Sequence, residues 1–164
     1  MNLTFNGNPI TLEGQQLQVN DTLKNFTVST NTLTKMSLAD TGGVRIFLSV
    51  PSLDTPVCST EVNTFNKRAS EIPGVTLYIV SMDLPFAQNR FCDANKIENV
   101  VTLSDHIERG FARATGTYIK EMGLLSRSVF VLDPNNKVVY VEYVQELTEH
   151  PNYDAVISAA KDIS

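Results

Sequence analysis

The 164-residue sequence contains no tryptophan and only two cysteines, at positions 58 and 92. It has no apolar run near the roughly 20 residues that a membrane-spanning helix needs, and no cluster of basic side chains suited to phosphate binding. Its first residues, MNLTFNG, lack the charged start and apolar core of a signal peptide. We therefore expect a cytoplasmic protein that binds neither membrane nor nucleic acid.

The composition is that of a globular protein. Hydrophobic residues make up 42% of the chain and charged residues 19%, and 13 basic against 18 acidic side chains give a net charge of -5. The sequence has no internal repeat, low-complexity tract or linker. We predict a single domain over residues 1–164, since a chain of this length can bury most of the surface that its unfolded form exposes.

The order of hydrophobic patterns predicts an α/β fold. Near-continuous apolar runs at 44–50 and 75–81 are typical of strands buried on both faces of a sheet. Turn residues predict β-hairpins, the clearest at 6–9, with others across 26–38 and between strands at 128–132 and 138–144. Helices are predicted at 56–72, 85–97, 105–119 and 152–163. This order indicates a thioredoxin-like fold, in which helices flank a central mixed β-sheet.

Two cysteines without further context are either inert buried thiols or a redox pair, because structural disulfides are rare in a reducing cytoplasm. The sequence has no C-x-x-C motif and no cluster of histidine with cysteine. A structural zinc site is therefore not predicted. The choice between inert and redox-active thiols depends on the surroundings of each cysteine.

Cys58 lies where a predicted strand gives way to a predicted helix, in the segment PSLDTPVC at 51–58. Thr55 suits the N-cap of that helix and Pro56 its first position. Cys58 falls in the first turn, on the same face as Val62 and Phe65, which the periodicity turns toward the core. Free N–H groups and the positive end of the helix dipole favour a thiolate there. The same N–H groups could stabilise an oxygen that leaves with negative charge.

Cys92 lies on the predicted helix 85–97, whose apolar side carries Phe91 and Ile97. The helical spacing places Cys92 with Gln88 on the more polar side, so we expect an accessible thiol there, with a modestly lowered pKa. Two thiols on different helices and in these orientations are not expected to meet while both helices are intact.

The two histidines are not predicted to be catalytic. His106 lies in DHIE at 105–108, a capping-box arrangement that predicts an exposed residue in the first turn of helix 105–119. His150 precedes a proline in a polar loop. The remaining charged residues are expected on solvated helix faces.

Pro51, Thr55 and Cys58 match the P-x-x-x-T-x-x-C motif of the peroxiredoxins. Within that family, the longer strings PSLDTPVC (51–58) and DLPFAQNRFC (83–92) closely resemble the bacterial thiol peroxidases, an atypical two-cysteine branch. The resemblance extends over essentially the whole chain and includes an N-terminal β-hairpin added to the thioredoxin-like fold. The second string is the more specific, because it separates this branch from other peroxiredoxins.

The resemblance implies a function for each of five residues. Cys58 would be the peroxidatic cysteine and Cys92 the resolving cysteine, joined in an intramolecular disulfide during turnover. Thr55 and Arg127 would hold the peroxide and activate the sulfur, and Pro51 would shield the intermediate. Arg127 fits because SRSVFV at 126–131 places it at the start of a buried strand.

The resemblance also implies the partners of the reaction. The substrates would be hydrogen peroxide and organic hydroperoxides, the alkyl and lipid forms included, and thioredoxin would be the reductant. No metal, haem or nucleotide cofactor is implied, and members of the family usually form homodimers.

Two other functions remain alternatives. A thiol–disulfide oxidoreductase on the same fold would normally carry C-x-x-C at the helix start, which this sequence lacks. A redox sensor that uses the disulfide only as a switch could share the same peroxide-binding residues. Peroxide consumption coupled to a thiol reductant distinguishes these possibilities.

Overall fold

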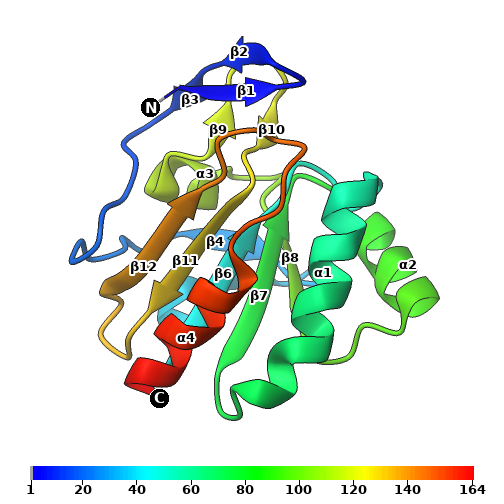
Figure 1. The fold of residues 1–164 in the computed structure, drawn as a ribbon. Coiled ribbons are helices and arrows are strands. Elements are labelled where there is room, and N and C mark those ends of the chain that lie inside the picture. The colour runs from blue at the N-terminus through cyan, green and yellow to red at the C-terminus, as the bar shows by residue number, and fades with distance from the viewer. Residues whose placement is uncertain (1) are drawn as a thin grey trace.

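The computed structural model describes residues 2–164, and its centre is a seven-stranded mixed β-sheet (Figure 1). The strand order is β12-β11-β6-β7-β8-β4-β5. The bounds of these strands, in chain order, are Thr27–Ser29 (β4), Lys35–Ser37 (β5), Arg45–Ser49 (β6), Thr76–Ser81 (β7), Val101–Ser104 (β8), Ser128–Leu132 (β11) and Val138–Tyr143 (β12).

The middle of the sheet is parallel and its edges are antiparallel. Strands β6, β7 and β8 run parallel to one another, whereas β11 pairs antiparallel with both β6 and β12. Every residue of β6 and β11 is buried. Apolar side chains on both sides of these strands are what the uninterrupted hydrophobic runs predicted.

Helices cover both faces of the sheet. On one face, α1 (Pro56–Arg68) and α4 (Tyr153–Ile163) pack against the sheet and share a core that includes Cys58. Helix α2 (Pro85–Asn95) lies beside α1 and contacts β8. On the other face, α3 (Gly110–Thr115) packs against a second core rich in aromatic rings. The predicted thioredoxin-like α/β fold is confirmed.

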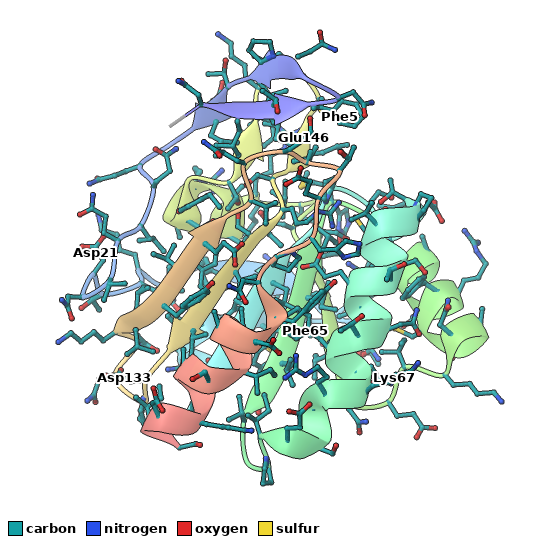
Figure 2. All side chains as sticks on the ribbon, in the orientation of Figure 1. Phe5, Asp21, Phe65, Lys67, Asp133 and Glu146 are labelled. Atoms are coloured by element: carbon teal, nitrogen blue, oxygen red, sulfur yellow. The ribbon has the colours of Figure 1, made fainter. Side chains whose placement is uncertain are left out.

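The N-terminal segment forms the predicted hairpin. Strands β1 (Leu3–Phe5) and β2 (Asn8–Ile10) are joined by Asn6 and Gly7, both with positive φ, as a two-residue turn of type I′ requires. Glu146 anchors the hairpin, because its Oε1 accepts hydrogen bonds from the Thr4 hydroxyl at 3.1 Å and from the Gly7 N–H at 2.8 Å. Figure 2 shows Phe5 and Glu146 together at this end of the molecule.

The remaining elements are short. Strands β3 (Leu12–Glu13), β9 (Tyr118–Ile119) and β10 (Leu124–Leu125) form a small sheet in the order β10-β9-β3. Two 3₁₀ turns cover Leu38–Asp40 and Ala69–Glu71. In residues 2–164 no helix has the length and apolarity needed to cross a membrane.

One predicted helix is largely wrong. The pattern at 105–119 predicted a helix that begins at Asp105, but α3 covers only Gly110–Thr115. The Asp105 side chain is buried, and its carboxylate accepts hydrogen bonds from the N–H groups of Phe111 and Ala112. Asp105 therefore lies five residues before the helix and caps it with its side chain, whereas the pattern predicted that the helix begins at Asp105. The other helices begin within one residue of the predicted positions, but α1 ends at Arg68, with a 3₁₀ turn in place of its last predicted turn, and α2 ends at Asn95.

Candidate active site

The first turn of α1 holds Cys58 as predicted. Thr55 is the N-cap residue, Pro56 takes the first helical position, and the Cys58 side chain is completely buried. The Thr55 side chain makes no capping hydrogen bond. Its hydroxyl instead donates to the Ser52 carbonyl at 2.9 Å, which closes the loop before the helix and leaves Thr55 exposed.

Arg127 lies just before β11 and reaches the cysteine. Its Nη1 donates to the Cys58 sulfur at 3.2 Å and to Oε2 of Glu61 at 2.7 Å. Its Nε and Nη2 both donate to the Leu147 carbonyl, at 3.0 and 2.8 Å. The guanidinium is thus held in one orientation by two fixed acceptors, and its charge lies against the sulfur. Such a contact stabilises a thiolate.

The electrostatics keep Arg127 charged although it is only 2% exposed. Burial lowers the pKa of its guanidinium, but the nearby Glu61 and Cys58 together more than offset this effect, so the pKa is raised. Burial raises the pKa of the Glu61 carboxyl, and the ion pair with Arg127 opposes that rise. The second carboxyl oxygen of Glu61, Oε1, is buried and has no hydrogen-bond partner among residues 2–164.

A pocket of about 260 Å³ lies above this cluster. Three of the predicted site residues, Pro51, Thr55 and Arg127, line it, while Cys58 is covered. The rest of the lining is mostly apolar and comes from four parts of the chain: Phe5, Pro56, Val57, Met122, Leu124, Leu147 and Thr148. A larger pocket of about 430 Å³, beside Arg109 and Tyr118, has no cysteine in its lining. The smaller pocket is therefore the candidate active site.

Cys92 differs from the prediction. Its side chain is half-buried and packs against the same apolar core as Cys58, and Gln88, on the same side of α2, is fully buried. The side of the helix that we predicted to be polar and solvated is therefore partly buried, and it packs against the protein together with Phe91 and Ile97. Burial raises the pKa of the Cys92 thiol, and the charge of Asp93 adds to that rise, whereas a hydrogen bond with Thr102 opposes it. The expected lowering of this pKa was wrong. Both cysteines are free thiols.

Comparison with known proteins gives the family. The Redoxin family pattern matches residues 18–157. The chain is 54% identical to the thiol peroxidase of Clostridium acetobutylicum over 161 residues, which cover 98% of each sequence. It is 54% identical to the thiol peroxidase of Bacillus subtilis over 160 residues, or 97% of this chain and 96% of the relative. The chain belongs to the thiol peroxidases of the redoxin family.

Solved structures agree with this family assignment. A peroxiredoxin-like protein from Aquifex aeolicus superimposes with a TM-score of 0.92 at 40% identity and covers 99% of this chain and 97% of its own. The thiol peroxidase from Chromobacterium violaceum superimposes with a TM-score of 0.90 at 17% identity, which shows the shared fold.

Glu61 is the residue of this thiol peroxidase site that sequence reasoning missed. We expected the remaining charged residues to lie on solvated faces, but Glu61 is completely buried. Its spacing held the signal, since a residue three positions after Cys58 lies on the same face of α1. A carboxylate on the core face of a helix needs a cationic partner, and Arg127 supplies it.

Neither histidine contacts Cys58. His106 is half-buried, with its Nδ1 2.8 Å from the Ser104 hydroxyl, so the expected exposed position was wrong. His106 follows β8 directly and lies before α3 begins. His150 is exposed and its Nδ1 lies 2.7 Å from the Tyr153 hydroxyl.

Proposed function

We propose that this thiol peroxidase reduces hydroperoxides at Cys58, with Cys92 as the resolving cysteine. One observation carries the proposal: a buried, permanently charged Arg127 donates a hydrogen bond to the Cys58 sulfur at the base of an otherwise mostly apolar pocket. The arrangement combines the two requirements of peroxide reduction, which are an ionised sulfur and a donor for the departing oxygen.

In the first step the Cys58 thiolate attacks one oxygen of the peroxide. A sulfur–oxygen bond forms as the oxygen–oxygen bond breaks, and the departing oxygen takes a proton and leaves as water or alcohol. Cys58 is then a sulfenic acid, and the sulfur has lost two electrons. Arg127 stabilises the negative charge that develops on the departing oxygen.

Two further residues are assigned to this step. The Thr55 hydroxyl lies at the pocket wall, bonded to the Ser52 carbonyl, and its free lone pairs are able to accept a hydrogen bond from the peroxide. Pro51 is buried beneath the pocket, offers no N–H and keeps water from the sulfur. Both assignments agree with the motif that Pro51, Thr55 and Cys58 share with the peroxiredoxins.

In the second step the Cys92 thiol attacks the sulfenic sulfur, which releases water and forms the Cys58–Cys92 disulfide. Arg127, the partner of Cys58, precedes β11, and Thr102, the partner of Cys92, lies on β8. Strands β6 and β7 lie between β11 and β8, which are therefore about 14 Å apart at the usual strand spacing. A disulfide requires Cα atoms within about 7 Å. Since the two cysteines bond to partners on such distant strands, we expect the first turn of α1, the segment around Cys92, or both to unwind before the sulfurs meet.

A dithiol reductant then reopens the disulfide by two thiol exchanges. We assign this role to thioredoxin from the family resemblance, and we expect the enzyme to act as a homodimer for the same reason. The apolar pocket favours organic hydroperoxides with an alkyl or lipid chain over hydrogen peroxide, because the transfer of an apolar chain from water into an apolar pocket lowers the free energy.

The test is peroxide-dependent oxidation of NADPH through thioredoxin reductase and thioredoxin. Wild-type enzyme should turn over, and Cys58→Ser should be inactive because a serine hydroxyl is not appreciably ionised. Cys92→Ser should form one equivalent of sulfenic acid and then stop. Turnover by Cys58→Ser would refute the proposal, and a wild type that forms the disulfide but consumes no peroxide catalytically would support the sensor instead.

Amide hydrogen exchange tests the unwinding. Residues 56–62 and 88–96 should exchange faster in the disulfide form than in the reduced form, because helix ends open at low free energy. The strands β6 and β11 serve as the internal control and should be protected equally in both forms. Equal protection of all four segments in both forms would rule out the unwinding step.

A further inference from the structure

Asp83 connects the two cysteine-bearing segments. It is the first residue of the string DLPFAQNRFC and lies between β7 and α2. Its carboxylate accepts a hydrogen bond from the Ser52 hydroxyl at 2.8 Å through Oδ1 and from the Leu53 N–H at 2.9 Å through Oδ2. Ser52 and Leu53 belong to the loop that leads into the first turn of α1. One carboxylate therefore fixes the approach to Cys58.

The same carboxylate is tied to α2. Its Oδ2 also accepts from the Ser81 hydroxyl at 2.8 Å, and that hydroxyl accepts from Nε2 of the fully buried Gln88 at 3.0 Å. Gln88 also donates to the Leu103 carbonyl of β8 at 2.8 Å. It lies one helical turn before Cys92, on the same side of α2. A continuous chain of hydrogen bonds thus runs from the Cys58 loop to the helix that carries Cys92.

The position of Asp83 is itself fixed by the sheet. The Ser104 hydroxyl, at the end of β8, donates to the Asp83 carbonyl at 2.6 Å. The Asp83 main chain can therefore remain in place while either cysteine segment moves. Unwinding of the first turn of α1 or of α2 would disturb the hydrogen bonds of Ser52, Leu53 or Gln88. Ser52 and Leu53 bond directly to the Asp83 carboxylate, and Gln88 is connected to it through Ser81.

We propose that Asp83 is a positioning residue that holds both cysteine segments in the reduced arrangement, so that its hydrogen bonds must break before the disulfide can form. This inference rests on the proposed peroxidase cycle. Asp83 would thereby influence which of two competing reactions the Cys58 sulfenic acid undergoes. Either Cys92 condenses with it and water is released, or a second peroxide oxidises it to sulfinic acid and is itself reduced to water or alcohol.

The decisive variant is Asp83→Asn, which keeps the shape of the side chain but replaces one accepting oxygen with an NH₂ donor. Because fewer hydrogen bonds must break, the variant should form the Cys58–Cys92 disulfide about tenfold faster after a single equivalent of peroxide. The excess of peroxide that converts half of Cys58 to sulfinic acid should rise by a similar factor. The readouts are rapid-quench alkylation for the disulfide and intact mass for the two added oxygens. Asp54→Asn, an exposed carboxylate in the same loop, is the matched control.

Thermal unfolding separates this role from general stabilisation. Asp83→Asn should lower the Tm of the reduced form more than that of the disulfide form, in which the proposed contacts are already broken. Ser52→Ala, which removes only the hydrogen bond between Ser52 and the Asp83 carboxylate, should show the same pattern more weakly. It provides a second test if Asp83→Asn fails to fold. Equal losses of Tm in both forms, with an unchanged rate of disulfide formation, would overturn the inference while leaving the peroxidase proposal intact. A wild type that forms no disulfide with peroxide would overturn both.

Discussion

Glu61 lies three residues after Cys58 on α1, and both side chains bond to the same nitrogen of Arg127. The carboxylate helps to raise the pKa of the guanidinium within the core, and the guanidinium in turn donates a hydrogen bond to the sulfur. The carboxylate and the sulfur therefore share one cation, and a substitution at either of them alters the surroundings of the other.

Replacement of Arg127 should slow the first chemical step. In Arg127→Gln we expect the rate of peroxide attack on Cys58 to fall by roughly 10²-fold or more, because a permanent charge at the reacting atoms is lost. Arg45→Gln is the matched control: Arg45 is also completely buried but bonds to neutral acceptors far along β6 from the cysteine. The Arg45→Gln variant should be less stable than wild type but should show the same rate of peroxide attack on Cys58. The measurement is stopped-flow oxidation of Cys58, and equal rate losses in both variants would contradict the assignment.

Removal of the Glu61 carboxylate should destabilise the folded protein. Glu61→Ala leaves the Arg127 charge buried without its anionic partner, and we expect the free energy of unfolding to fall by about 3–5 kcal/mol. Glu61→Gln retains an acceptor for Nη1 and should lose less. Urea denaturation of the reduced proteins measures both values. A Glu61→Ala variant as stable as wild type would show that the ion pair does not hold the site together.

The buried Asp105 predicts a pH dependence of stability. Burial raises the pKa of this carboxyl to about 6, although two backbone hydrogen bonds at the start of α3 oppose the shift. Because the folded state then binds the proton more tightly than the unfolded state, the contribution of Asp105 to stability is present at low pH and declines as the pH rises from about 4 to about 6. From about pH 4 to about pH 6, the free energy of unfolding should therefore fall by about 3 kcal/mol more in wild type than in Asp105→Asn, which cannot titrate at this position. Parallel stability curves for the two proteins would contradict the raised pKa.

The pocket wall should determine the choice of substrate. Phe5→Ala removes the aromatic ring that the N-terminal hairpin contributes, so we expect a higher KM for a bulky hydroperoxide such as cumene hydroperoxide and little change for hydrogen peroxide. Leu33→Ala, an exposed residue of the β4–β5 turn, is the control and should alter neither value. The steady-state assay decides the outcome, and an equal change for both peroxides would exclude a role in specificity.

The sequence predicted the fold and the core of the site for identifiable reasons. The strands at 44–50 and 75–81 were clear because buried parallel strands are apolar on both faces. Thr55, Pro56 and Cys58 were placed correctly because helix starts have local chemical signals. The prediction of a single domain over residues 1–164 stays a prediction.

The errors have one physical cause, which is the burial of polar side chains whose hydrogen-bond partners helical periodicity does not reveal. Helix 85–97 showed Phe91 and Ile97 as its apolar side, but the buried side also carries Gln88, because Ser81 and Leu103 satisfy its amide nitrogen. Helical periodicity treats every polar residue as exposed. For the same reason it missed Glu61, whose partner Arg127 is 66 positions away. A buried polar residue is recognised only when its partner is known.

The distance along the chain between Cys58 and Arg127 also matters while the protein is being made. The two residues are 69 positions apart. At about 5–20 residues per second, a ribosome needs several seconds to extend the chain from one to the other. During that interval Cys58 has neither its cation nor the two strands, β11 and β12, that complete this side of the sheet. The hydrogen bond from the Arg127 guanidinium to the Cys58 sulfur therefore forms only when β11 docks beside β6. This order of synthesis delays the proposed activation of Cys58 until the fold that surrounds it is nearly complete.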